Sequence, residues 1–138
     1  MKILGIDYGE SKVGLAIGDT DSKVATPYNT IKNRNANILI KDITSVCQQE
    51  SIDQIIVGLP INDQANSSGQ IKKIEKFIAD LKTATSLEVL AEDERFSTQM
   101  AHTMTGDGKK DDSVSAMIIL QSYFDKGSMT NDQAPNNK

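Results

Sequence analysis

Residues 1–18, MKILGIDYGESKVGLAIG, decide the fold of this chain. Two short apolar runs flank a segment rich in glycine and charge, and this pattern predicts two strands joined by a tight turn. Asp7 stands where the first run stops. Because an unpaired carboxylate is costly to bury, its charge needs compensation, and a bound cation is one candidate. Gly9 and Gly14 remove side chains around Asp7 and leave room for a ligand or another backbone.

The composition is typical of one soluble globular domain. Of the 138 residues, 38% are hydrophobic and 25% are charged, which is enough for a real core. The single cysteine, Cys47, excludes a disulfide framework, so we expect a cytoplasmic protein with this thiol in its core. No apolar run approaches the length of a membrane span, so we expect no membrane partner. The net charge of −4 argues against nucleic-acid binding over the whole surface but allows a local basic patch.

Hydrophobic periodicity predicts an α/β fold with helices on both faces of a mixed five-stranded sheet. Its first three strands form an antiparallel meander, and Pro27 places the third strand at an edge. Asn35 is expected to cap the first helix. The remaining elements follow at residues 36–50 (helix), 54–59 (strand), 70–82 (helix), 87–91 (strand), 98–104 (helix) and 112–125 (helix). The domain therefore spans residues 1–125, and residues 126–138 are predicted to form a disordered tail.

Three acidic residues fall where such a sheet can gather them. Asp7 follows the first strand, Glu94 follows the last strand, and Asp112 begins the final helix. If they converge, they offer hard oxygen ligands without histidine or cysteine, a set that suits Mg²⁺ or Mn²⁺. Such ions support phosphodiester hydrolysis. The alternatives are structural, with Asp112 as a helix cap and Glu94 in a surface ion pair.

Several basic side chains are candidates for contacts with phosphate. Arg95 is one because a guanidinium pairs bidentately with phosphate oxygens, and Lys12 lies just after the turn that follows Asp7. Structural pairing with neighbouring acids is the alternative for both. Further lysines gather on one face of a predicted helix or in a loop: Lys72, Lys73, Lys76, Lys109 and Lys110. They form either an ordinary solvated surface or a track for nucleic acid.

Four motifs, in this order, make the chain resemble the YqgF/RuvX family. They are GIDYGESKVGLAIGD at residues 5–19, IVGLPIN at 56–62, DERFST at 93–98 and DDSVSAMIILQSYF at 111–124. The resemblance implies an RNase H-like fold and a metal-dependent nuclease, a hydrolase that uses magnesium or manganese. It favours processing of the 5′ end of the 16S rRNA precursor in ribosome biogenesis, with resolution of Holliday junctions in DNA as the alternative.

By position, the resemblance places the catalytic and metal-binding acids on Asp7, Glu94 and Asp112. The substrate-binding candidates are Lys12, Arg95, Lys73 and Lys110. The chain departs from the family pattern at Glu10, at Gln64 and Ala65, and in a shortened segment before Asp112. Glu10 adds a negative charge beside the predicted site, so these departures concern the handling of substrate more than the acids.

Two other classes of function stay open on the sequence alone. Residues 7–9, Asp-Tyr-Gly, also resemble the phosphate loop of the ATP-binding fold of actin and sugar kinases, but that fold uses two lobes and this chain offers one. The other class is a non-catalytic nucleic-acid-binding module. The chain is expected to be a monomer or a homodimer, and a resolvase, which cuts two strands symmetrically, is expected to be a dimer.

Overall fold

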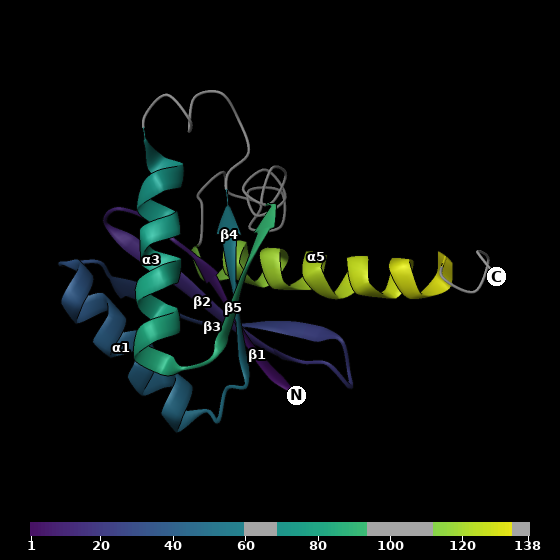
Figure 1. The fold of residues 1–138 in the computed structure, drawn as a ribbon. Helices are drawn as coiled ribbons and strands as arrows, with labels where there is room; N and C mark the ends of the chain where they lie inside the picture. The colour runs from purple at the N-terminus through teal and green to yellow at the C-terminus, as the bar shows by residue number, and fades with distance from the viewer. Residues whose placement is uncertain (60–68, 94–111, 134–138) are drawn as a thin grey trace.

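The computed structural model describes residues 1–59, 69–93 and 112–133, which form a sheet with helices on both faces (Figure 1). The strands are β1 (Lys2–Asp7), β2 (Lys12–Asp19), β3 (Val24–Lys32), β4 (Gln54–Leu59) and β5 (Glu88–Asp93). The helices are α1 (Ala36–Gln49), α3 (Gln70–Thr85) and α5 (Asp112–Gln133). None of these helices is long and apolar enough to cross a membrane.

The order of strands across the sheet is β3-β2-β1-β4-β5. β1, β2 and β3 pair antiparallel, whereas β1, β4 and β5 run parallel. The predicted mixed five-stranded sheet and its meander are therefore confirmed. Because parallel strands end at the same edge of a sheet, the last residues of β1, β4 and β5 lie together. We call this the carboxyl edge; the strands reach it at Asp7, Leu59 and Asp93.

The two faces of the sheet are covered differently. α1 and α3 pack on one face, which we call the α1/α3 face, and α5 lies across the other, the α5 face (Figure 1). The α1/α3 face buries a large apolar cluster that includes Leu4, Ile6, Ile43, Phe77 and Leu81. The α5 face buries a smaller cluster that includes Ile3, Ile56, Ile119, Leu120 and Phe124. Successive strand residues alternate between these two cores, as the pleat of a strand requires.

Glycines on β1 and β2 let α5 lie directly on the backbone of the sheet. A Cβ atom at Gly5 would lie 2.9 Å from Cβ of Leu120. One at Gly14 would collide with the carbonyl oxygen of Asp112. The first turn of α5 is therefore fixed against β2 by the absence of a side chain at Gly14.

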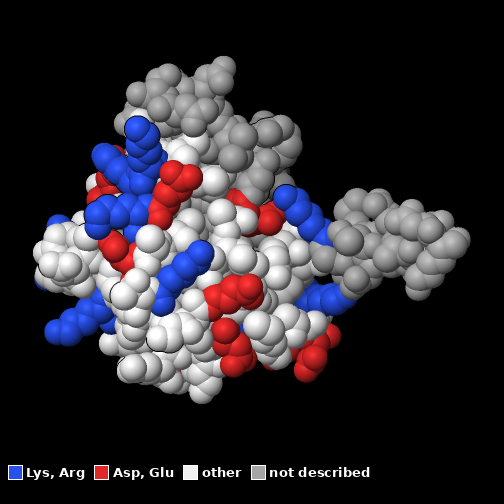
Figure 2. Space-filling model, in the orientation of Figure 1, with Lys and Arg blue, Asp and Glu red and all other residues white. Residues whose placement is uncertain are grey.

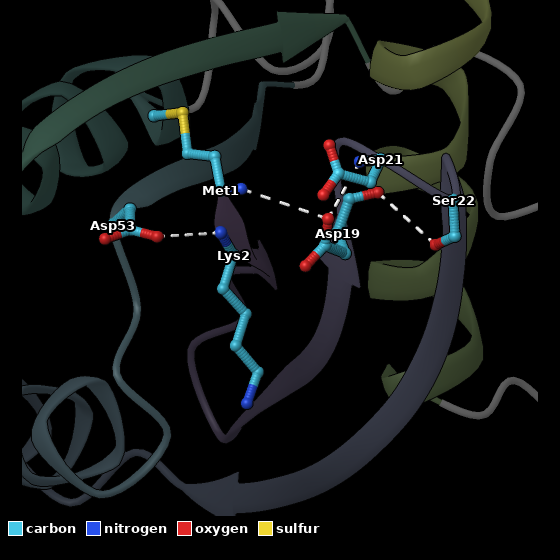
Figure 3. A network of polar contacts seen from close by, with 6 residues as sticks. All are labelled: Met1, Lys2, Asp19, Asp21, Ser22 and Asp53. Carbon is cyan, nitrogen blue, oxygen red and sulfur yellow. Dashed lines mark hydrogen bonds and ion pairs between the residues drawn. The ribbon is translucent and has the colours of Figure 1, made fainter.

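The opposite edge of the sheet, where β1 begins, is held by a polar network (Figure 3). The backbone N–H of Lys2 donates to Oδ2 of Asp53 at 2.8 Å, and the N–H of Asp53 donates to the carbonyl of Lys2 at 2.7 Å. The terminal ammonium of Met1 lies 3.9 Å from Oδ1 of Asp19. The acids at this edge have backbone and terminal partners and serve the fold.

The last helix is longer than the sequence predicts. A helix over residues 112–125 is expected, but α5 continues to Gln133, so the prediction of a disordered tail is wrong for residues 126–133. Once the first turn of a helix has formed, each added residue costs little, and polar residues without periodicity can extend it. The rest of the predicted tail, 134–138, and the predicted short helix at 98–104 lie outside the described residues.

Candidate active site

Asp7 is a buried carboxylate at the carboxyl edge. It is the last residue of β1, and only 4% of it is exposed. Ile6 belongs to the apolar cluster of the α1/α3 face, so the alternation of the strand directs Asp7 to the α5 face. Its partner in the ladder with β2 is Gly14, which has no side chain to crowd it.

Asp112 reaches the same place from the far end of the chain. It is the first residue of α5, and its carbonyl oxygen lies over Gly14, the ladder partner of Asp7. Asp112 is only partly buried. The structure therefore brings two of the three predicted acids together, although 105 positions separate Asp7 from Asp112 in the printed numbering.

The third predicted acid, Glu94, lies outside the described residues, as do Arg95 and Lys110. β5 ends at Asp93, so the described chain reaches the carboxyl edge one residue before Glu94. The assignments of Glu94, Arg95 and Lys110 stay predictions from the sequence.

Glu92 is a buried acid that the sequence analysis did not single out. Its side chain is 8% exposed; it accepts a hydrogen bond from Oγ of Ser122 at 3.3 Å and pairs with Nζ of Lys126 at 2.7 Å. These contacts tie the end of β5 to α5. The signal was present in the alternation of β5, because Val89 is buried in the α1/α3 cluster and Glu92 therefore faces α5.

Register places the acids of the α5 face in one row across the sheet. Ile6 pairs with Val57, so the next residue of β4, Gly58, lies beside Asp7, and Gly58 itself pairs with Glu92. The row therefore reads Gly14, Asp7, Gly58 and Glu92 from β2 to β5. The two glycines leave space on either side of Asp7 on this face.

The donors at this edge fit a hard divalent cation. Asp7 and Asp112 both offer carboxylate oxygens, the ligands that Mg²⁺ and Mn²⁺ prefer. Within residues 1–59, 69–93 and 112–133, however, no three His, Cys, Asp or Glu side chains form a group that could hold a metal ion. Glu94, which the sequence predicts as the third acid, lies outside the described residues.

The turn that follows Asp7 is fixed from two sides. The ring of Tyr8 packs against Phe77 of α3, with ring centroids 4.7 Å apart. On the other side, Nδ2 of Asn33 donates to the carbonyl of Gly9 at 2.8 Å, and its backbone N–H donates to that of Ser11 at 2.9 Å. These contacts hold the backbone on which Asp7 depends for its position.

Glu10, at the tip of this turn, is tied to a lysine that the sequence assigns to substrate binding. Nζ of Lys73, near the start of α3, donates to Oε1 of Glu10 at 2.8 Å, and both side chains are more than half exposed. The hydrogen bond and the opposite charge lower the pKa of Glu10 and raise the pKa of Lys73. The negative charge of Glu10 is thus partly balanced by Lys73, which lies near the carboxyl edge.

Basic side chains gather over the upper part of α3 in Figure 2. The exposed lysines of this segment are Lys72, Lys73 and Lys76, and Nζ of Lys76 lies 3.0 Å from Oδ2 of Asp80. Lys12 is exposed at the first residue of β2, two residues before Gly14. The structure therefore places Lys73 against Glu10 in the turn after Asp7 and Lys12 two residues before Gly14, and their roles stay predictions.

One family model and several relatives match almost the whole chain. The family described as "RuvX: Holliday junction resolvase" matches residues 1–126. A protein of Clostridium tetani named "Putative pre-16S rRNA nuclease" is 35% identical over 133 residues, which cover 91% of this chain and 96% of the relative. A protein of the same name from Bacteroides fragilis is 38% identical over 135 residues, covering 90% and 96%.

Solved structures share the fold. The structure of RuvC from Thermus thermophilus aligns with 94% of this chain and 98% of its own, with a TM-score of 0.65 and 14% identity. The same protein in complex with a Holliday junction substrate aligns with 90% of this chain at a TM-score of 0.61 and 13% identity. At these identities the likeness shows the architecture, and it confirms the RNase H-like fold that the sequence motifs imply.

Proposed function

The chain belongs to the RuvX family, whose description is "Holliday junction resolvase", and we propose that it is a metal-dependent nuclease that hydrolyses phosphodiester bonds. Its proposed substrate is the precursor of 16S rRNA, because the named relatives at 35% and 38% identity are called pre-16S rRNA nucleases. The single cysteine is buried and unpaired, which is consistent with a reducing, cytoplasmic compartment.

The meeting of Asp7 and Asp112 across Gly14 is the observation that carries this proposal. A buried carboxylate is costly, and the fold places Asp7 on the α5 face, beside Gly14, where the backbone of Asp112 at the start of α5 lies. Asp19 and Asp53 lie at the opposite edge of the sheet, where they accept from backbone N–H groups and Asp19 pairs with the terminal ammonium.

Asp7, Asp112 and, by the sequence motif, Glu94 are the residues that would hold Mg²⁺ or Mn²⁺. When bound, such an ion supplies a Lewis acid that makes water a stronger nucleophile and stabilises the charge on the leaving oxygen. The work of the protein is to fix these carboxylates. α5 does so by resting on Gly14, and the turn after Asp7 does so through Tyr8 and Asn33.

The basic residues have a separate task. The net charge of −4 repels a polyanion, so binding depends on local cations. We assign Lys12, Lys73, Arg95 and Lys110 to contacts with the phosphates that flank the bond to be cut. Because the ion pair with Glu10 engages Lys73, the substrate has to compete with that carboxylate for the lysine.

The second candidate substrate is a four-way DNA junction, and the description of the family favours it. A resolvase must introduce two symmetric cuts, so this function requires two copies of the chain at one junction. The two proposed functions can therefore be distinguished by which substrate the protein cuts and by the number of protein copies in its complex with that substrate.

The test compares wild type with Asp7→Asn on end-labelled 16S precursor RNA and on a four-way DNA junction, in the presence of Mn²⁺. We expect wild type to cut the RNA near the mature 5′ end. Asp7→Asn should cut neither substrate, and its cooperative thermal unfolding should show that it is folded. If wild type cuts the junction and leaves the RNA intact, resolution of DNA junctions replaces processing of the 16S rRNA precursor as the proposed function. Equal cleavage by both proteins would refute the acidic site.

A further inference from the structure

Two lysines face each other at the open end of the β2–β3 hairpin. Lys12, the first residue of β2, and Lys32, the last residue of β3, are direct partners in the antiparallel ladder. Both are exposed. Among the described residues, neither ammonium group has a carboxylate partner.

Like charges directly opposite one another on a sheet are destabilising, because cross-strand partners hold their Cβ atoms close together. The Lys12–Lys32 pair therefore costs the free protein stability. An anion that lies between the two ammonium groups would remove that cost and replace repulsion by two attractions. The pair is consequently suited to an anionic ligand.

The pair lies on the face of the sheet that carries the acids. The adjacent partners in the ladder, Val13 and Ile31, both pack in the apolar cluster of the α1/α3 face. Alternation therefore directs Lys12 and Lys32 to the α5 face, as it does Gly14. Along β2, Lys12 is two residues before Gly14, a distance of about 7 Å at the rise of an antiparallel strand.

We propose that Lys12 and Lys32 together bind a backbone phosphate of the nucleic-acid substrate, next to the phosphate of the bond to be cut at the proposed acidic site. The inference rests on the proposed function and adds to it a second lysine and the direction in which the substrate strand leaves the acids. The strand passes beyond the first residue of α5 and over the end of the β2–β3 hairpin. Lys72 and Lys76 lie on α3, which covers the other face, so they do not share this site.

The experiment measures binding separately from cleavage. End-labelled 16S precursor RNA and a four-way DNA junction are titrated with wild type, Lys12→Gln, Lys32→Gln and Lys41→Gln over a range of salt concentrations, with Ca²⁺ in place of Mn²⁺. Lys41 is the matched control, because it is an exposed lysine on α1, over the other face of the sheet. Melting temperatures are recorded for all four proteins.

For Lys32→Gln we expect weaker binding and a slope of log affinity against log salt that is smaller by about one, the value of one lost phosphate contact. Lys12→Gln should behave alike, and Lys41→Gln should match wild type. Neither Lys12→Gln nor Lys32→Gln should melt below wild type, because each relieves the repulsion across the ladder.

Affinity and salt slope of Lys32→Gln equal to those of Lys41→Gln would overturn the inference, and so would a wild type that binds neither nucleic acid. The first result is distinct from failure of the proposed function, whereas a wild type that binds neither nucleic acid would refute both. If wild type cuts RNA and Lys32→Gln binds and cuts equally well, the lysine pair is wrong and the nuclease stands. If binding depends on Lys32 but wild type cuts nothing, the phosphate site stands and the nuclease falls.

Discussion

The two faces of the central sheet bury different kinds of residue. On the α1/α3 face, the buried cluster consists of aliphatic and aromatic side chains together with Cys47. All four buried polar or charged residues of the described chain lie at the α5 face: Asp7, Gln54, Glu92 and Ser115. One face therefore supplies stability, and the other combines a smaller core with groups that are costly to bury.

This difference shows how a single small sheet can carry the proposed site. The apolar cluster on the α1/α3 face fixes the strands, and the strands in turn fix the row of glycines and acids on the α5 face. A change on the first face should therefore affect stability, and a change on the second should affect the site.

Leu81→Ala tests the α1/α3 face. Leu81 is fully buried near the end of α3 that lies away from the carboxyl edge. Its truncation should lower the free energy of unfolding by about 2–5 kcal/mol, the usual cost of a large cavity in a core. Urea denaturation measures the loss. Well below the melting temperature, the turnover number per folded molecule should equal that of wild type, and a large fall in turnover would break the separation of the two faces.

Gly14→Ala tests the α5 face with a single methyl group. The new Cβ would collide with the carbonyl of Asp112, so the first turn of α5 must move away from Asp7. We expect a loss of about 1–3 kcal/mol in stability from overpacking and a fall of about 100-fold in cleavage rate from misplaced acids. Denaturation and single-turnover cleavage give the two numbers. A variant that is destabilised but cleaves normally would show that the contact of α5 with Gly14 does not position the acids.

Glu92 and Lys126 allow a finer test of how α5 is attached. Glu92→Gln keeps an acceptor for Ser122 and loses the ion pair with Lys126. We expect the free energy of unfolding to fall by about 1 kcal/mol, because Lys126 is exposed and solvent weakens the pair. Lys126→Met should cost more, because it leaves a buried carboxylate without this cation. Thermal denaturation compares the two variants; the reverse order would mean that the lysine contributes little to holding β5 against α5.

The reactivity of the Cys47 thiol should show whether the core on the α1/α3 face is intact. Its effect on stability is the smallest that we expect. Burial raises the pKa of its thiol to about 11, so at pH 8 the native protein should resist alkylation by iodoacetamide. The unfolded chain releases this proton at lower pH than the native one, so stability should decrease as pH rises from about 9 to about 11. Mass spectrometry of alkylated samples checks the first expectation. Rapid labelling of folded protein would contradict it.

Local patterns predicted much of this structure. Strand and helix periodicity gave the five strands in their order along the chain and the helices on both faces, and Asn35 caps α1 as expected, with Oδ1 accepting from the N–H of Ile38 at 2.9 Å. Cys47 is buried as predicted. These features depend on neighbours in the sequence, where the physical signal is strong.

Pairing between distant segments could not be predicted in the same way. The strands β1 and β4 are apolar on both faces, so their sequences do not say which residues meet α5. The register of β2 with β3, including the irregularity at Leu15 and Ala16, determines that Lys12 meets Lys32. The convergence of the acidic side chains stays a prediction from the motifs, whereas the contact of the first turn of α5 with Gly14, the ladder partner of Asp7, is visible only in the structure.

Titration with Mn²⁺ tests directly whether the carboxylates on the α5 face bind a metal ion. Asp7 and Asp19 are the last residues of neighbouring strands but lie at opposite edges of the sheet, so Asp7→Asn and Asp19→Asn form a matched pair. In isothermal titration calorimetry we expect wild type and Asp19→Asn to bind Mn²⁺ alike and Asp7→Asn to lose most of that binding. Equal binding by Asp7→Asn and wild type, or no binding by wild type, would contradict a metal site on the α5 face.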